Sequence, residues 1–317
     1  MAGLRQPILA IPPVAPVPSL LTVARPLTGL PAGASWQSGI AFQPGCSIQS
    51  HNWPLCPVTT NKTMASGLGT LVATEPFMIY AGVECDYPMT ETGDEINDAA
   101  RSQVEAATAA GLASALWMGD GLTTTADSYY GLPPTLRRSS TDVSASLGGA
   151  AALLDVVAEL LWRYEQCTFG LGGAVLHIPT ILIPGALGGI AGGGRVAWPE
   201  GNFYRGPAGS VVSGGPGYPH GHFPDGATAP GPYVSGSPPN EVYRGNAYNE
   251  AWVYISGPVE YAVGDINLIT TEQAGDRFAP APRQNRYTLV AERMALVRFD
   301  PCCCFAARAL VTIAEVS

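Results

Sequence analysis

The strongest periodic pattern of apolar residues in the chain runs from Asp94 to Met118. No proline interrupts it, and small or apolar residues recur at steps of three and four positions, at Ile96, Ala100, Val104, Ala107, Gly111 and Ala115. This spacing predicts a helix with one apolar stripe. Thr92 can cap its start, and Gly119 and Gly121 can end it. At 1.5 Å per residue the helix spans roughly 35–40 Å, which is long for a domain of this size.

The rest of the pattern predicts shorter elements. A second helix is expected over 147–166 and a short buried strand over 174–183. Strands return near the C-terminus, where Asp300–Pro301 is the turn between the last two, and they are expected at 252–255, 259–263, 287–299 and 305–313.

Turn-forming residues dominate the remaining segments. Residues 36–80 are predicted to form a long β-hairpin with a polar, glycine-containing tip at 58–69. Prolines break up the aliphatic residues of 1–35, so we expect an extended arm that lies on its own body or on a neighbour. Loops are expected at 122–145, 185–194 and 199–250.

Composition suggests a protein that covers much of its surface with partners. Charged residues make up 13% of the chain, about half the usual share, while glycine (38) and proline (29) are abundant. The net charge of −9 argues against a protein that recognises nucleic acid, because such a protein needs a basic face. Prolines within 1–24 and 174–191 argue against a signal peptide and a membrane span.

The charge is unevenly distributed along the chain. Residues 1–74 contain Arg5, Arg25 and Lys62 and no acidic residue, whereas all 25 acidic residues follow from Glu75 onward. The cationic N-terminal quarter could therefore dock electrostatically on an anionic neighbour. The alternative is that the segment lacks acidic residues by chance.

The seven cysteines show no metal-binding or secreted-disulfide spacing. They are Cys46, Cys56, Cys85, Cys167 and the run Cys302–Cys304, with no CxxC pair. We expect free, buried thiols in a reducing cytosol. The run is interpreted as packing, or as partly exposed at a subunit contact, rather than as a catalytic thiol.

The order of these elements resembles the major capsid proteins of tailed double-stranded-DNA bacteriophages, which share the Hong Kong ninety-seven type shell fold. The resemblance covers essentially the whole chain and is carried by Leu116-Trp117-Met118-Gly119, Gly215-Pro216-Gly217-Tyr218-Pro219, Gly257-Pro258-Val259-Glu260, 285–293 and 297–303. It implies an α+β phage-capsid shell fold. Its parts would be an N-terminal arm (1–35), an extended E-loop hairpin (36–80), a P-domain with the long spine helix (81–146), an A-domain (147–250) and closing P-domain strands (251–317).

The resemblance also implies a function without catalysis, cofactor or metal. Copies of the chain would assemble into hexamers and pentamers of an icosahedral phage head, which encloses packaged DNA without sequence-specific binding. Further partners would be scaffolding, portal and decoration proteins but no membrane, and the location would be the virion, assembled in the host cytoplasm. Alternatives are an encapsulin-like cargo nanocompartment, a minor head or tail component, and a loop-rich metal-dependent hydrolase or ligand-binding protein.

The hydrolase alternative depends on His220, His222 and Asp225, which could be metal ligands in a loop. A two-residue histidine spacing arises easily by chance and no third ligand has a recognisable spacing, so no metal is predicted. The acids Glu91, Asp94, Glu95 and Asp98 are explained by the helix dipole without an ion. His177 lies in an apolar segment and is expected to be a hydrogen-bonded core residue.

Lys62 is the only lysine in the chain and falls near the predicted hairpin tip. Some shells of the resembled fold join such a lysine to an asparagine of a neighbour, so Lys62 is a candidate for an inter-subunit crosslink. The reaction needs a deprotonated amine and a carboxylate that moves protons. The alternative is an ordinary solvated lysine.

Overall fold

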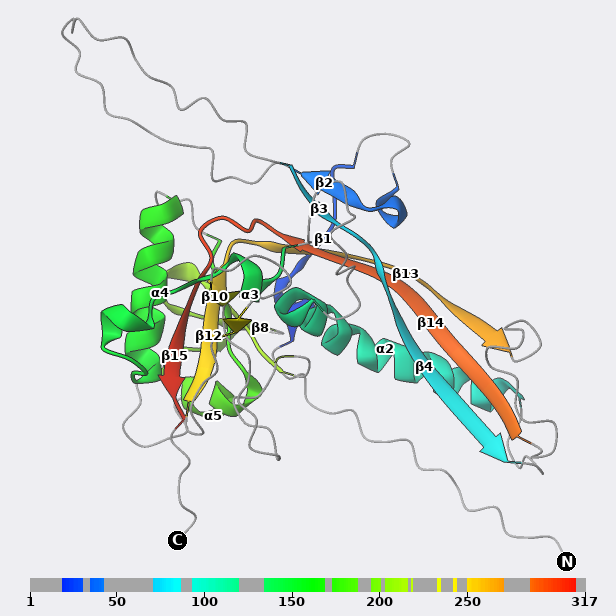
Figure 1. The fold of residues 1–317 in the computed structure, drawn as a ribbon. Coiled ribbons are helices and arrows are strands. Elements are labelled where there is room, and N and C mark those ends of the chain that lie inside the picture. The colour runs from blue at the N-terminus through cyan, green and yellow to red at the C-terminus, as the bar shows by residue number, and fades with distance from the viewer. Residues whose placement is uncertain are drawn as a thin grey trace, which may run out of the picture.

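The chain has two structural parts, a compact body and an elongated wing (Figure 1). The computed structural model describes residues 19–30, 35–42, 71–86, 93–119, 134–168, 173–187, 195–200, 203–215, 218, 233–234, 242–243, 250–270 and 286–311. We call the four-stranded sheet with helix α2 the wing, and the seven-stranded sheet with helix α4 the body. In Figure 1 the body lies at the left and the wing extends to the right.

The wing is built from long antiparallel strands. Its sheet has the order β1 (Arg25–Pro26), β13 (Val259–Thr270), β14 (Arg286–Phe299) and β4 (Phe77–Asp86). β14 pairs antiparallel with both β13 and β4, and β1 pairs parallel with β13. The β13 ladder is shifted between Val263 and Ile266, as a β-bulge would shift it.

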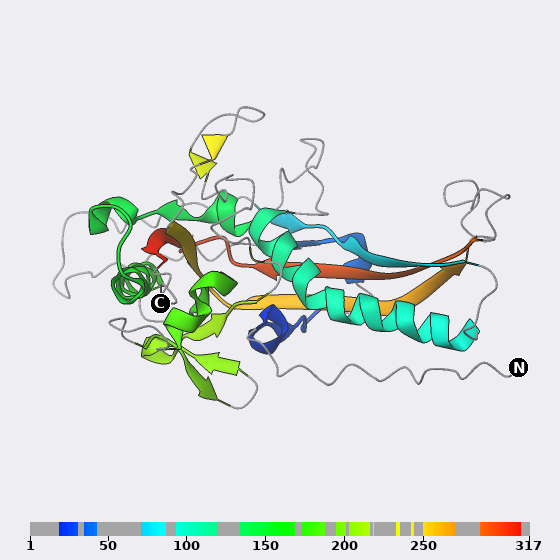
Figure 2. The ribbon, with the colours of Figure 1, turned by 90° about the horizontal axis from the view of Figure 1, so that it is seen from below.

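Helix α2 (Gly93–Met118) runs along one face of the wing sheet, and confirms the long helix predicted from the sequence (Figure 2). The helix lies close to β4 at Gly111, where a Cβ would come within 2.9 Å of Ile79 Cδ1. A glycine is required there for the helix to approach the sheet this closely. The helix ends at Gly119, which has a φ of +87° and donates its N–H to the Ala115 carbonyl at 3.0 Å.

The body is a mixed sheet with a helix on one face. Its order is β5 (Thr141–Asp142), β15 (Phe305–Leu310), β12 (Glu250–Ser256), β6 (Val175–His177), β9 (Val211–Ser213), β8 (Phe203–Arg205) and β7 (Trp198–Glu200). Helix α4 (Leu153–Thr168) buries Val157, Leu160 and Leu161 against this sheet. The predicted strands 252–255, 287–299 and 305–313 correspond to β12, β14 and β15, and the 259–263 strand continues to Thr270.

The body and the wing share a joint at which the chain crosses twice between their sheets. β12 leads into β13 through Gly257–Pro258, and β14 leads into β15 through residues 300–304. The core of the joint combines β12 with the C-terminal end of α2. Trp117 there lies 4.4 Å from Tyr254 and 5.1 Å from Tyr218, measured between ring centroids.

Several predicted boundaries were wrong, each for a local reason. The 147–166 helix begins only at Leu153, because a 3₁₀ turn at Ser144–Leu147 ends on Gly148 in the left-handed region. The predicted 174–183 strand stops at His177. Pro179 then precedes a 3₁₀ turn, Thr180–Leu182, and helix α5 (Ile183–Ala186).

Two segments predicted to lack regular structure contain short elements. Within 199–250 the structure has β8, β9, a 3₁₀ turn at Pro207–Gly209, and the pair β10 (Tyr233–Val234) and β11 (Val242–Tyr243). Within 122–145 it has α3 (Leu136–Ser139) and β5.

The predicted arm 1–35 is not wholly extended. It contains helix α1 (Leu20–Val23), whose Leu20 is buried in the core of the joint. Among the described helices, none is both long and apolar enough to span a bilayer.

Candidate assembly surfaces

The base of the predicted hairpin is an antiparallel pair of three-residue strands. β2 (Ile40–Phe42) follows a 3₁₀ turn at Trp36–Ser38 and pairs with β3 (Val72–Thr74). The Thr74 hydroxyl donates to the Val297 carbonyl at 3.1 Å and fixes this base to β14. The predicted tip at 58–69 and Lys62 lie outside the described residues, so the crosslink stays a prediction.

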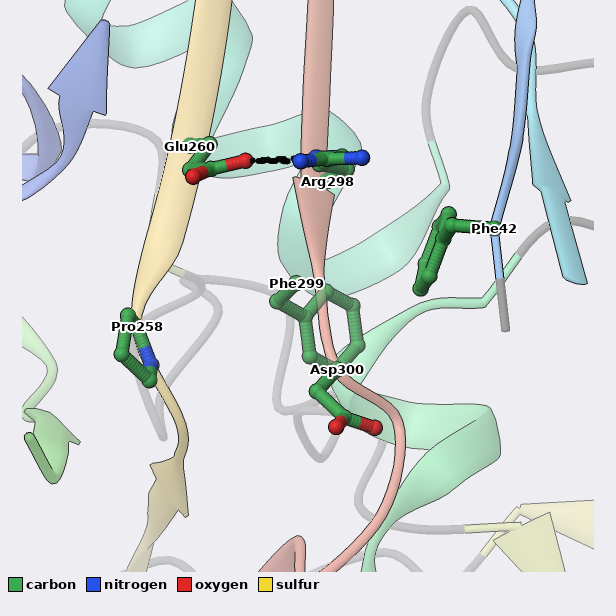
Figure 3. Close-up of a pocket in the computed structure, with 6 residues that line it drawn as sticks. All are labelled: Phe42, Pro258, Glu260, Arg298, Phe299 and Asp300. Carbon is green, nitrogen blue, oxygen red and sulfur yellow. Dashed lines mark hydrogen bonds and ion pairs between the residues drawn. The ribbon is translucent and has the colours of Figure 1, made fainter. Parts of the chain in front are cut away.

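A depression of about 260 Å³ lies where the hairpin base meets the joint (Figure 3). Its lining combines aromatic, proline and charged side chains, namely Phe42, Pro258, Glu260, Arg298, Phe299 and Asp300. Arg298 donates to Glu260 at 2.6 Å across the β13–β14 pair, and its guanidinium lies 5.4 Å from the Phe42 ring centroid. Arg298 therefore connects the hairpin base to the wing through an ion pair and a cation–π contact.

One face of the wing sheet is covered by α2, and the other is partly exposed among the described residues, most clearly on β4. On β4, Phe77 and Ile79 point to the helix and are buried, whereas Met78 and Tyr80 are 40% and 73% exposed. β4 is also an edge strand of the sheet. An exposed apolar and aromatic face beside a free strand edge is typical of surfaces that other protein covers.

The body exposes large apolar side chains at separate places. Leu154 and Trp162 lie on α4, and Trp198 lies on the edge strand β7. Tryptophan is enriched at the energetic centres of protein interfaces. The sequence alone does not distinguish these exposed tryptophans from the buried Trp117 and Trp252.

His177 is a core residue, as predicted. Its Nε2–H donates to Ser256 Oγ at 2.8 Å, since the Ser256 hydroxyl itself donates to the Gly257 carbonyl. Nδ1 then accepts from the Tyr218 hydroxyl at 2.9 Å. Burial lowers the pKa of His177 to about 3, so the ring is neutral, and burial raises the pKa of Tyr218. The network joins β6 and β12 beside the crossing to the wing.

The expectation of free thiols was wrong for Cys167, Cys302 and Cys303 and is confirmed for Cys304. Cys303 forms a disulfide with Cys167 at the end of α4, with their Cα atoms 5.5 Å apart, and Cys302 is also disulfide-bonded. Cys303 has a φ of +59°, which turns the chain between β14 and β15. The sequence does not indicate this pair, because 136 residues separate its members and only the fold brings them together. Cys304 is a free, buried thiol whose pKa is raised by burial.

The remaining candidate metal ligands stay untested. His220, His222 and Asp225 lie outside the described residues, and so do the side chains of Glu91, Asp94 and Glu95. Within the described part of the chain, no cluster of three or more histidine, cysteine or acidic side chains could hold a metal ion.

Comparison with known proteins identifies the fold through structure alone. No protein-family model and no curated protein sequence matches the chain. A solved structure of Mycobacterium phage Ogopogo matches with a TM-score of 0.52 and 11% identity over 96% of each chain. One of Microbacterium phage Oxtober96 matches with a TM-score of 0.51 and 13% identity, covering 98% of this chain and 95% of that one. The capsid of an empty GTA particle matches with a TM-score of 0.50 and 13% identity, covering 98% and 94%. The chain therefore has the phage-capsid shell fold that its sequence predicts.

Proposed function

We propose that this chain is the major capsid protein of a tailed DNA bacteriophage. Copies of it would assemble into hexamers and pentamers of an icosahedral head that encloses packaged DNA. The observation that carries the proposal is the match to the capsid of a GTA particle, which extends over 98% of this chain and 94% of that chain. The match extends over both the wing and the body, so it is not limited to one shared substructure.

The distribution of exposed apolar residues supports a role in assembly. Tyr80 and Met78 lie on the open face of the wing, and Trp162 and Trp198 lie on the body. A chain with 13% charged residues that also exposes these side chains is suited to being covered by further copies of itself. The role is structural, and the chain would carry out no reaction of its own.

We assign the two parts of the fold to the domains that the resemblance implies. The wing would be the P-domain with α2 as its spine helix, and α4 with β6 to β11 would form the A-domain. β12 and β15 come from the closing segment 251–317 and complete the body's sheet, so the proposed domains share one sheet. The hairpin that starts at β2 and β3 would be the E-loop.

Negative-stain electron microscopy of the protein expressed alone, with light scattering for mass, tests the proposal. Closed shells, or rings of five and six copies, are expected. DNA inside particles from infected cells would separate a phage head from a nanocompartment, which would carry protein cargo. A chain that stays monomeric both alone and with co-expressed scaffolding protein would contradict the proposal.

A further inference from the structure

Helix α4 carries an exposed apolar stripe that no described part of the chain covers. Leu154, Ala158 and Trp162 are four residues apart, so they lie on one side of the helix. Leu154 is 45% and Trp162 51% exposed. We call these three residues the helix patch.

The indole of Trp162 is held in place before any partner binds. The Arg163 guanidinium lies 4.9 Å from the ring centroid. Glu159 accepts from Arg163 at 2.9 Å and from the Ser146 hydroxyl at 2.7 Å, so the carboxylate that positions the arginine is itself held by a second donor. A pre-organised aromatic side chain loses little conformational entropy on binding, which favours it as an interface anchor.

A second exposed aromatic surface lies at the β7 edge of the body's sheet. All three β7 residues, Trp198, Pro199 and Glu200, are exposed, and Trp198 is opposite Arg205 on β8. Pro199 has no N–H to donate, so it disfavours the addition of a further strand to this edge. A partner would therefore meet side chains here. We call Trp198, Glu200, Arg205 and the adjacent Arg195 the edge patch.

The two patches differ in charge. Beside the helix patch, Asp155 and Glu165 add negative charge to the Glu159–Arg163 pair. In the edge patch, Arg195 adds positive charge to the Glu200–Arg205 pair, whose Arg205 Nη2 donates to Glu200 Oε1 at 2.9 Å. The helix patch is therefore net acidic and the edge patch net basic, which favours contact between the two and disfavours either patch meeting itself.

The patches are also separate surfaces of one body. α4 packs on β15 and β12, and β7 lies four strands beyond β12 in the sheet order. At 4.7–4.9 Å per strand this places them about 20 Å apart. In Figure 2, α4 is viewed along its axis and the yellow-green strands of the β7 edge lie below it.

We propose that the helix patch of one copy packs against the edge patch of the next copy, in a head-to-tail contact between bodies. The inference rests on the proposed function and names the surfaces that would join copies within one ring. Because every copy carries both surfaces, the contact repeats from copy to copy and closes into a ring when the rotation allows it.

Two variants that each lose one surface test the proposal. Trp162→Arg removes the helix patch and Trp198→Arg removes the edge patch, and both side chains are exposed enough for the fold to tolerate the change. Each variant alone should need a concentration about thirtyfold higher than wild type to assemble, the effect of losing one interface anchor. Trp162→Phe, which keeps an aromatic ring, should stay within about threefold.

Mixing the two arginine variants gives the decisive result, read by mass photometry. The intact edge patch of Trp162→Arg can bind the intact helix patch of Trp198→Arg, so one-to-one dimers should form and larger rings should not. If either variant alone assembles like wild type, or if the mixture forms no dimer, the contact is overturned while the proposed function stands. If wild type itself does not assemble under any condition, both fail together.

Discussion

The wing and the body are both sheets with a helix packed on one face, but they bury their strands very differently. In the body, β12 is buried on both faces from Ala251 to Ser256, because α4 covers one face and the C-terminal end of α2 covers the other. In the wing, α2 covers one face of the sheet and much of the other is open. Near the far end, the described buried core is limited to Ala100, Val104, Leu289 and Ala291.

This difference means that the two parts remove different shares of their apolar surface from water. The body's sheet is covered on both faces at β12, whereas the wing's sheet packs on a helix on one face only and leaves more of its apolar surface for neighbouring copies to cover. The wing is stabilised at its base by the joint around Trp117. In the proposed shell it would gain the rest from neighbouring copies.

The largest effect is expected from Trp117→Ala, which leaves a cavity in the core of the joint. Trp117 is 1% exposed and contacts Tyr254 and Tyr218, so its loss should lower the free energy of unfolding by about 3–5 kcal/mol. Urea unfolding of the unassembled subunit measures it. Trp117→Phe should cost less, since Nε1 has no hydrogen-bond partner among the described residues. Trp162→Ala removes the same side chain at an exposed site and should lower the free energy of unfolding by under about 1 kcal/mol. Equal losses at Trp117 and Trp162 would contradict the burial of Trp117 in the core of the joint.

The next effect concerns the body, where Cys167 and Cys303 are joined. Cys167→Ser should remove about 2–4 kcal/mol of stability under oxidising conditions and have little effect in reductant. Maleimide labelling of denatured, unreduced virion protein should modify Cys304 and leave Cys167 and Cys303 unmodified. Labelling of all three would show that the bond is absent in the particle.

A smaller effect is expected where the wing's helix lies closest to its sheet. Gly111→Val introduces a Cβ within 2.9 Å of Ile79 Cδ1 and should destabilise by about 1–3 kcal/mol. Valine has a higher helix propensity than glycine, so a loss in Gly111→Val comes from the contact, and Ala106→Val at an exposed position of the same helix should cost under about 1 kcal/mol. An unchanged or higher stability of Gly111→Val would mean that the contact with β4 is loose.

The remaining effect is a pH dependence of stability from His177, which is small near neutral pH. Because its folded pKa of about 3 lies below the ordinary value of 6.5, the unfolded chain binds the proton first. Its contribution is fully present above pH 6.5 and decreases as the pH falls towards 3, by roughly 1 kcal/mol per pH unit within that window. His177→Gln should flatten the dependence of unfolding free energy on pH between 4 and 6. An unchanged slope would assign the pH dependence to other groups.

Elements with long periodic patterns were predictable from the sequence, and contacts between distant residues were not. The helix at 93–118 was predicted nearly to the residue. Its segment contains no proline, and its small and apolar residues repeat at steps of three and four positions, a pattern that fits only a helix. The 174–183 strand was wrong because an apolar run does not distinguish a strand from a buried turn, and Pro179 ended the ladder. The Cys167–Cys303 bond and the Trp162 and Trp198 surfaces depend on which face of each element meets the core, which a single sequence does not reveal.

Cryo-electron microscopy of assembled particles tests most directly whether the wing depends on its neighbours. We expect closed icosahedral particles in which another copy covers Tyr80 and Met78 on the open face of the wing. Closed particles held together through the bodies alone, with that face in contact with solvent, would contradict this expectation.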